Sequence, residues 1–176
     1  MVPGAAWGEI EMALAANRLE HRTGYYCTWI NVRREANCAF SLDMPHNLVI
    51  PIPIAHAEGR FTTGEEDLVE ILERDGQIAF RYCDSGGLVG DEFPVNPNGS
   101  VGAFAGVTNP RGNILAFMPH PERASWLRQV PVSTQGVWGA RRLGAQGNLK
   151  LLDAPGPGTP FFTSMKRYIE REGIAS

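Results

Sequence analysis

Met118-Pro119-His120-Pro121-Glu122-Arg123 is the stretch from which the fold and the chemistry of this 176-residue chain are best worked out. It follows an apolar run, residues 114–117, that predicts a short buried strand. The two prolines exclude a helix, because each lacks an N–H group and disfavours helical dihedrals in the residue before it. In an extended backbone, residues two positions apart project to the same face. We therefore expect His120 and Glu122 to lie side by side at the end of a strand.

An imidazole beside a carboxylate forms the base and the orienting member of a nucleophilic triad, because the carboxylate holds the ring in one tautomer. The alternative is a surface turn in which His120 and Glu122 make an incidental ion pair. A position at the end of a buried strand favours the functional interpretation, since α/β enzymes build their sites there. The sequence therefore predicts catalytic roles for both residues and leaves the nucleophile to be found.

The composition narrows the class of protein. Hydrophobic residues make up 43% and charged residues 20%, as in an ordinary single globular domain. The net charge is −3 and the arginines are scattered, so neither nucleic acid nor a membrane is an expected partner. No apolar run approaches the ~20 residues of a membrane span, and the first residues do not resemble a signal peptide. Three unevenly spaced cysteines make no disulfide framework, which predicts a cytoplasmic protein.

The first third of the chain predicts one helix and two strands. Helix propensity favours a helix over residues 9–16, and aromatic and β-branched residues favour a strand over 25–32. A further apolar run, residues 48–54, contains Pro51 and Pro53. These prolines confine the run to a sheet edge or to an irregular strand.

The rest of the chain alternates helical and extended patterns, which is typical of an α/β domain. Thr63 and Glu66 form a capping-box pattern for a helix that Gly76 ends. The segment from Ala124 to Gly158 is rich in glycine and proline, and its weak pattern predicts an irregular excursion. Strands are predicted at 78–83, 101–107 and 113–118, and a last helix, capped by Thr159 with Pro160 at its first position, at 159–172.

Two other stretches leave alternatives open. The loop 96–100, Asn-Pro-Asn-Gly-Ser, offers backbone N–H groups to a small polar ligand, but by itself it favours a tight turn. His56 and Glu58 repeat the spacing of His120 and Glu122, and four such ligands are a set that a divalent metal accepts. The Pro-Cys-x-x-Cys motif that accompanies His-x-Glu in zinc deaminases is absent.

None of the three cysteines fits the pattern of a catalytic thiol, which needs an exposed turn between strand and helix and a lowered pKa. Cys27 lies within a predicted strand and is expected to be packed, and Cys38 has no helix after it. Cys83 precedes Asp84, whose charge raises a thiol pKa. All three are expected to be structural.

The order and spacing of several motifs give a specific resemblance. The chain resembles the glutaminase (glutamine amidotransferase) component of phosphoribosylformylglycinamidine synthase. The matching stretches are Pro53 to Phe61, Arg81-Tyr82, Asn96 to Ser100, Ala105 to Asn109, Gly112 to Leu115 and Met118 to Arg123. Weaker agreement covers most of the remaining chain apart from residues 124–157.

The resemblance implies roles for particular residues. Members of the family are class I amidotransferases with a Cys-His-Glu triad, so His120 would be the base and Glu122 its orienting carboxylate. Three residues of the 96–100 loop, Asn98, Gly99 and Ser100, would help to cradle glutamine. His56, Glu58 and Arg60 would lie near the active site or the partner interface, although Ala57 stands where the family usually has glycine.

The resemblance also implies a fold and a domain organisation. We expect an α/β, partial class I glutamine amidotransferase domain, flavodoxin-like with three layers. Residues 1–176 would form one incomplete domain, with 124–157 inserted before the C-terminal helix. The first residues resemble the segment after the family's nucleophile elbow, so the N-terminal strands and the cysteine are expected to be missing. A parallel sheet truncated in this way would expose an edge, and we expect aggregation or dimerisation through it.

The function that the resemblance implies is hydrolysis of glutamine to supply ammonia for the ATP-dependent amidation of formylglycinamide ribonucleotide in purine biosynthesis. The expected partners are glutamine, the synthetase subunit, which would hold ATP and magnesium, and a separate N-terminal half with the cysteine. No cofactor is expected in this chain. Two alternatives remain open: a catalytically inactive remnant or interaction module that docks on the synthetase, and a metalloenzyme that uses both His-x-Glu pairs.

Overall fold

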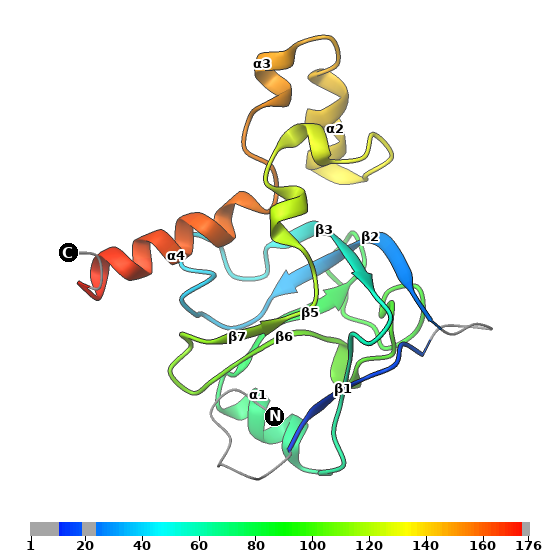
Figure 1. Ribbon diagram of the computed structural model, residues 1–176, viewed down its shortest axis with the longest axis vertical. Helices are drawn as coiled ribbons and strands as arrows, with labels where there is room; N and C mark the ends of the chain where they lie inside the picture. Colours follow the sequence, from blue (N-terminus) through cyan, green and yellow to red (C-terminus); the bar gives the residue numbers. More distant parts are fainter. Residues whose placement is uncertain (1–10, 19–23, 174–176) are drawn as a thin grey trace.

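A central antiparallel sheet organises the computed structural model, which describes residues 11–18 and 24–173 (Figure 1). Its strand order is β3-β2-β5-β6-β7, and every pairing is antiparallel. The strands are β2 (Tyr26–Arg34), β3 (Val49–His56), β5 (Ile78–Cys83), β6 (Phe104–Thr108) and β7 (Leu115–Phe117). The expected parallel pairing is therefore wrong for the described strands. For β6 and β7 the short connection requires an antiparallel pair.

The strand predictions are confirmed with small shifts at their ends. β3 pairs only with β2 and is an edge strand, as its prolines required. The backbone carbonyl of Pro53 points away from β2, because it accepts the N–H of His120 at 2.9 Å. Proline at this position therefore removes no hydrogen bond from the ladder. Residues 101–103, predicted as the start of a strand, form the 3-10 helix η1 (Val101–Ala103) instead.

A two-stranded ribbon replaces the helix that was predicted over residues 9–16. Within the described part of that range, Ala13–Ala15 forms strand β1 and pairs with β4 (Arg60–Thr62). Met12 is buried beside Phe61 in the same apolar cluster. Intrinsic helix propensity is a weak preference, and here the pairing with β4 and the burial of Met12 override it. Residues 9 and 10 lie outside the described residues.

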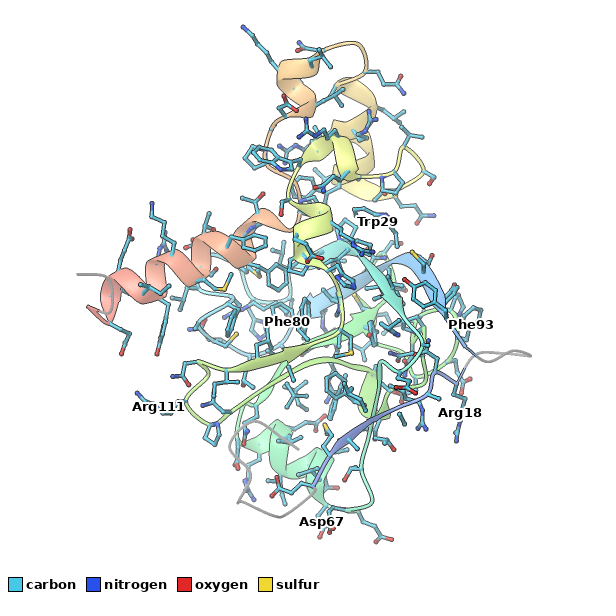
Figure 2. The ribbon with its side chains drawn as sticks, in the orientation of Figure 1. Arg18, Trp29, Asp67, Phe80, Phe93 and Arg111 are labelled. Atoms are coloured by element: carbon cyan, nitrogen blue, oxygen red, sulfur yellow. The ribbon has the colours of Figure 1, made fainter. Side chains whose placement is uncertain are left out.

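Helices cover both faces of the sheet, which confirms the α/β class. On one face lies α4 (Thr159–Arg171) (Figure 1). Its Phe161 contacts Phe80 and Phe117, with ring centroids 5.1 Å apart in both pairs; Phe80 is labelled on the sheet in Figure 2. On the other face lie α1 (Leu68–Arg74) and the β1–β4 ribbon. None of the helices in the described ranges is long and apolar enough to cross a bilayer.

The predicted capping box at the start of α1 does not form, whereas the predicted end of the helix at Gly76 is confirmed. The hydroxyl of Thr63 donates to the carbonyl of Glu11 at 2.7 Å and accepts the N–H of Glu65 at 3.0 Å. Thr63 therefore ties the ribbon together, and the helix begins only at Leu68, after the uncapped Asp67. Gly76 follows the helix with φ of 65°, the left-handed conformation that favours glycine at a helix end.

The segment predicted to be irregular contains helices. They are η3 (Leu127–Gln129), α2 (Gly136–Gly144) and α3 (Leu149–Leu152), and the last two project beyond the sheet (Figure 1). The 3-10 helix η2 (Pro121–Ala124) comes just before them. Glycines weaken the helical pattern of α2, but Gly139 is required by packing, because a Cβ there would lie 1.6 Å from the carbonyl oxygen of Thr134. The side chain of Asn148 caps α3 by accepting the N–H of Leu151.

Candidate functional site

The backbone after β7 brings His120 and Glu122 together. His120 is fixed by its N–H, which donates to Pro53 on the edge strand β3. Pro121 then begins η2, so Glu122 lies in the first turn of a 3-10 helix. His120 and Glu122 lie side by side as predicted, but this turn brings them together and not a continuing strand. Proline suits the first helical position because its fixed φ is already helical and its missing N–H has no partner there.

The imidazole and the carboxylate form a direct hydrogen bond. The distance between Nδ1 of His120 and Oε1 of Glu122 is 2.7 Å. Because a carboxylate only accepts, Nδ1 carries the hydrogen and Nε2 keeps its lone pair, as a general base requires. The side chains are 31% and 56% exposed, so the pair is open to a substrate.

Close backbone packing holds η2 in place under the start of α4. A Cβ on Gly158 would lie 2.1 Å from the carbonyl oxygen of Pro121, so only glycine fits. The hydroxyl of Ser125 donates to the same carbonyl at 2.9 Å, and that of Thr159 donates to the carbonyl of Ser125 at 2.7 Å. Thr159 is therefore not the predicted helix cap, a position that Gly158 takes without a side-chain bond. These contacts make the support of the His120–Glu122 pair rigid.

A second imidazole lies at the end of β3. Nδ1 of His56 is 2.9 Å from Oδ1 of Asn17, and the amide nitrogen of Asn17 donates to the carbonyl of His56 at 2.6 Å. Burial first, and then the ring of His120, lower the pKa of His56. The two imidazoles therefore belong to one electrostatic environment. Sequence reasoning missed Asn17, because nothing in its local pattern connects it with a residue 39 positions away.

The 96–100 loop clamps the segment that follows His56. Asn98 is fully buried, and its amide nitrogen donates to the carbonyl of Gly59 at 2.8 Å. The hydroxyl of Ser100 donates to Oδ1 of Asn98 at 2.8 Å and accepts the N–H of Phe61 at 3.1 Å. Gly99 has φ of 75°, so the tight turn is present. The backbone N–H groups of Gly99 and Ser100 donate to Oδ1 of Asn96 inside the protein, and the role of the loop in cradling glutamine stays a prediction.

Glu58 and Arg60, the other two candidate residues that follow His56, do not join the His120–Glu122 pair in a common site. Glu58 is exposed, and Nε of Arg60 donates to the carbonyl of Ala16 at 2.9 Å. In the described part of the chain, no three histidine, cysteine, aspartate or glutamate side chains gather as a metal would need. The four residues of the two His-x-Glu pairs therefore do not form a common metal site in this structure.

The three thiols lie in unlike surroundings. Cys27 is exposed, contrary to the prediction that it would be packed, because this end of β2 pairs only with β3 and β5 joins β2 from Asn31 onward. Burial raises the pKa of Cys38, and it raises that of Cys83 to about 12. Among the described residues no cysteine sulfur forms a hydrogen bond with His120.

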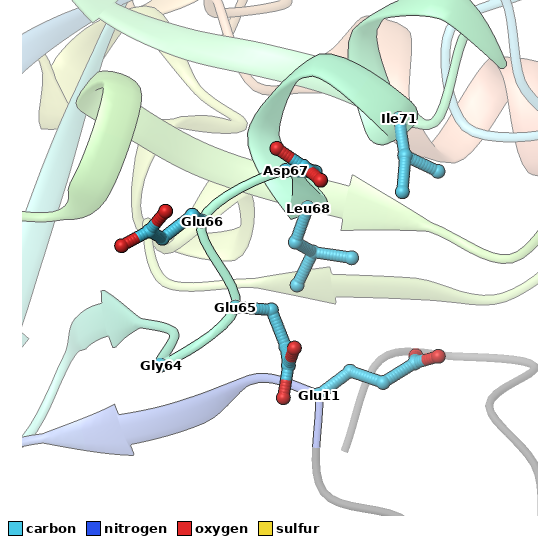
Figure 3. Close-up of a pocket in the computed structure, with 7 residues that line it drawn as sticks. All are labelled: Glu11, Gly64, Glu65, Glu66, Asp67, Leu68 and Ile71. Carbon is cyan, nitrogen blue, oxygen red and sulfur yellow. The ribbon is translucent and has the colours of Figure 1, made fainter.

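A surface hollow in the described part of the chain lies elsewhere (Figure 3). It sits at the start of α1, on the sheet face opposite α4. Carboxylates dominate its lining, which consists of Glu11, Gly64, Glu65, Glu66, Asp67, Leu68 and Ile71. The negative charge of this hollow repels the α-carboxylate of an amino-acid substrate. Neither His120 nor Glu122 lines it.

Comparisons with known proteins identify the family of the chain. The profile of the family described as CobB/CobQ-like glutamine amidotransferase domain matches residues 1–169. The chain is 40% identical over 169 residues to phosphoribosylformylglycinamidine synthase subunit PurQ of Methanothrix thermoacetophila, covering 92% of this chain and 59% of that protein. It is 50% identical over 102 residues to the same subunit of Aquifex aeolicus, covering 57% and 44%.

One solved structure is also similar to this chain. The structure of PurLQS from Thermotoga maritima superposes with a TM-score of 0.56 at 26% identity, over 92% of this chain and 55% of the other. The chain thus spans 59% of the first of these relatives and 44% of the second.

Proposed function

Because the chain belongs to the CobB/CobQ-like glutamine amidotransferase family, we propose that it supplies the base and the orienting carboxylate of a phosphoribosylformylglycinamidine synthase glutaminase. The observation that supports this proposal is the 2.7 Å hydrogen bond between Nδ1 of His120 and Oε1 of Glu122. It leaves Nε2 of His120 free to take a proton.

In the proposed reaction, Nε2 of His120 removes the proton of a cysteine thiol, and the thiolate attacks the side-chain carbonyl carbon of glutamine. Glu122 stabilises the imidazolium that forms. The imidazolium then protonates the amide nitrogen, which leaves as ammonia, and a glutamyl thioester remains. Water attacks the thioester carbon while His120 takes its proton, and glutamate leaves as the thiol is restored.

The thiol in this proposal comes from a segment outside these 176 residues. Cys38 and Cys83 are buried with raised pKa values, and no described thiol is hydrogen-bonded to His120. The ammonia passes to the synthetase subunit, which holds ATP and magnesium and amidates formylglycinamide ribonucleotide. A thiol nucleophile and three unpaired cysteines suit a reducing compartment, so we place the reaction in the cytoplasm.

The test is glutamine-dependent ammonia release by the chain mixed with the synthetase subunit and the segment that carries the thiol. We expect release to fall by about 10²–10⁴-fold in His120→Ala, the range of general acid–base catalysis. Diazo-oxonorleucine, a glutamine-like electrophile, should label one cysteine of the mixture. If it labels none and no ammonia forms, the glutaminase proposal is wrong.

A second candidate function is a non-catalytic module that docks on the synthetase. The observation that favours it is the lack of a described thiol hydrogen-bonded to His120. The same mixture separates the two functions. A docking module would bind the synthetase with equal affinity in wild type and His120→Ala, and neither protein would release ammonia.

A further inference from the structure

His56 has a fixed tautomer, because the orientation of Asn17 is fixed. The amide nitrogen of Asn17 donates to two carbonyls, those of Gly24 at 3.0 Å and His56 at 2.6 Å. Oδ1 of the same side chain accepts the N–H of Gly59 at 3.3 Å and lies 2.9 Å from Nδ1 of His56. An amide oxygen has only acceptor sites, so Nδ1 must carry the hydrogen and Nε2 a lone pair.

That lone pair is buried and has no partner within the described residues. Nε2 of His56 is shielded from solvent and forms no hydrogen bond there. The ring is held in place, because a Cβ on Gly59 would lie 2.4 Å from both Cε1 and Nδ1. Buried acceptors without a donor are rare in native proteins, and each calls for an explanation such as a missing ligand.

His56 lies close to the proposed base. His120 is anchored by its N–H on the carbonyl of Pro53, three residues before His56 on the same edge strand. Burial is the larger cause that lowers the pKa of His56, and the electrostatic influence of the His120 ring is the second. A neutral ring that offers only a lone pair therefore lies beside the group that handles the protons of the reaction.

We propose that His56 is a specificity-determining residue whose Nε2 accepts a hydrogen bond from the side-chain amide of glutamine. This inference rests on the proposed glutaminase function. A carboxamide nitrogen has two N–H donors, whereas the carboxylate of glutamate has only acceptor oxygens. Glutamine therefore satisfies the lone pair, and glutamate places a negative oxygen against it. A polar site of this kind discriminates strongly, because the wrong ligand leaves a buried group unpaired.

The test compares glutamine with glutamate in the ammonia-releasing mixture. In His56→Phe we expect KM for glutamine to rise about 10- to 100-fold, as the loss of a buried hydrogen bond to substrate predicts. The inhibition constant of glutamate should stay the same or fall. His56→Gln, whose amide oxygen restores an acceptor, should recover part of the loss. His46→Phe, at an exposed histidine, is the matched control and should change neither constant.

A purely structural role for His56 gives a different result. Loss of the fold around β3 would weaken glutamine and glutamate equally, and His56→Gln would not rescue, so either outcome overturns the inference. Nitrogen NMR of the histidines in the wild-type mixture gives a readout that does not need turnover. Glutamine should shift the His56 Nε2 resonance and glutamate should not; equal shifts, or none, would contradict the proposal. Absence of ammonia release by wild type refutes instead the proposed function.

Discussion

At the scale of single residues, Glu122 decides which nitrogen of His120 is available. The carboxylate holds the hydrogen on Nδ1 and stabilises the ring when it becomes positive. Asn17 does the same for the tautomer of His56, but as a neutral amide it offers no charge to stabilise an imidazolium. The two rings are thus oriented by different partners, a carboxylate for His120 and a neutral amide for His56.

The first prediction at this scale concerns Glu122→Gln. The amide of glutamine can present an N–H to Nδ1, which favours the wrong tautomer of His120 and removes the negative charge. We expect kcat/KM for ammonia release to fall about 10²–10⁴-fold. Glu66→Gln, at an exposed carboxylate of the hollow at the start of α1, is the control and should leave kcat/KM within about twofold of wild type. Equal losses in both variants would contradict the assignment.

The second prediction follows from the lowered pKa of His56. In the unfolded chain this ring takes a proton near its ordinary pKa of about 6.5, whereas in the folded chain burial delays protonation to lower pH. Its contribution to stability is therefore complete above about pH 6.5 and is lost progressively as the pH falls towards the folded pKa. Urea unfolding at about pH 7.5 and pH 5.5 should show a smaller loss for His56→Phe than for wild type or His46→Phe.

At the scale of elements, the turn between β7 and η2 and the 96–100 loop have complementary roles. The turn presents the His120–Glu122 pair. The loop fixes the backbone after His56 through buried hydrogen bonds, because Asn98 donates to the carbonyl of Gly59 and Ser100 accepts the N–H of Phe61. The helices α2 and α3 depend on a separate and much smaller core, formed by Leu127, Val130 and Ala145. The stability of the chain is therefore unevenly distributed along the sequence.

The third prediction belongs to these two helices. Segments with few buried apolar contacts open at lower free energy than core strands. We expect the amides of α2 and α3 to exchange with deuterium faster than those of β5 and β6, whose side chains are almost all buried. Mass spectrometry of peptides covering 136–152 and 78–83 measures the difference. Equal protection of the two regions would show that α2 and α3 unfold only with the sheet.

At the scale of the whole molecule, the edges of the sheet are less open than the sequence suggested. β3 carries Pro51 and Pro53, and the chain before η2 covers it through the hydrogen bond from His120. The other edge strand, β7, has only three residues. Prolines, covering segments and short strands are known protections against edge-to-edge pairing. Exposed apolar side chains lie instead on α2 and α3, among them Val137 and Leu149.

The fourth prediction is that the isolated chain self-associates through the exposed apolar side chains of α2 and α3. Val137 and Leu149 are 67% and 79% exposed, and Arg141, Arg142 and Lys150 lie near them in the sequence. We expect the double variant Val137→Glu, Leu149→Glu to lower the average mass measured by light scattering. Leu88→Glu, at a leucine 72% exposed on a separate loop, is the control. Association unchanged by the double variant, or a monomeric wild type, would contradict the prediction.

The sequence by itself determined the features that depend on neighbouring residues. Runs of β-branched and aromatic residues located β2 and β5, prolines marked β3 as an edge strand, and Gly76 marked the end of α1. The spacing of His120 and Glu122 was enough to predict that their side chains meet, because only one residue separates them.

The tertiary structure decided what depends on residues far apart in the chain. The pairing of β1 with β4 overrode a local helix propensity, and packing against Thr134 explains a glycine inside α2 that obscured its helical pattern. The tautomer of His56 depends on Asn17, 39 residues earlier. Such residues can form a hydrogen bond only when the fold brings their atoms within about 3 Å, and only then is it settled which atom donates. No local sequence pattern encodes that distance.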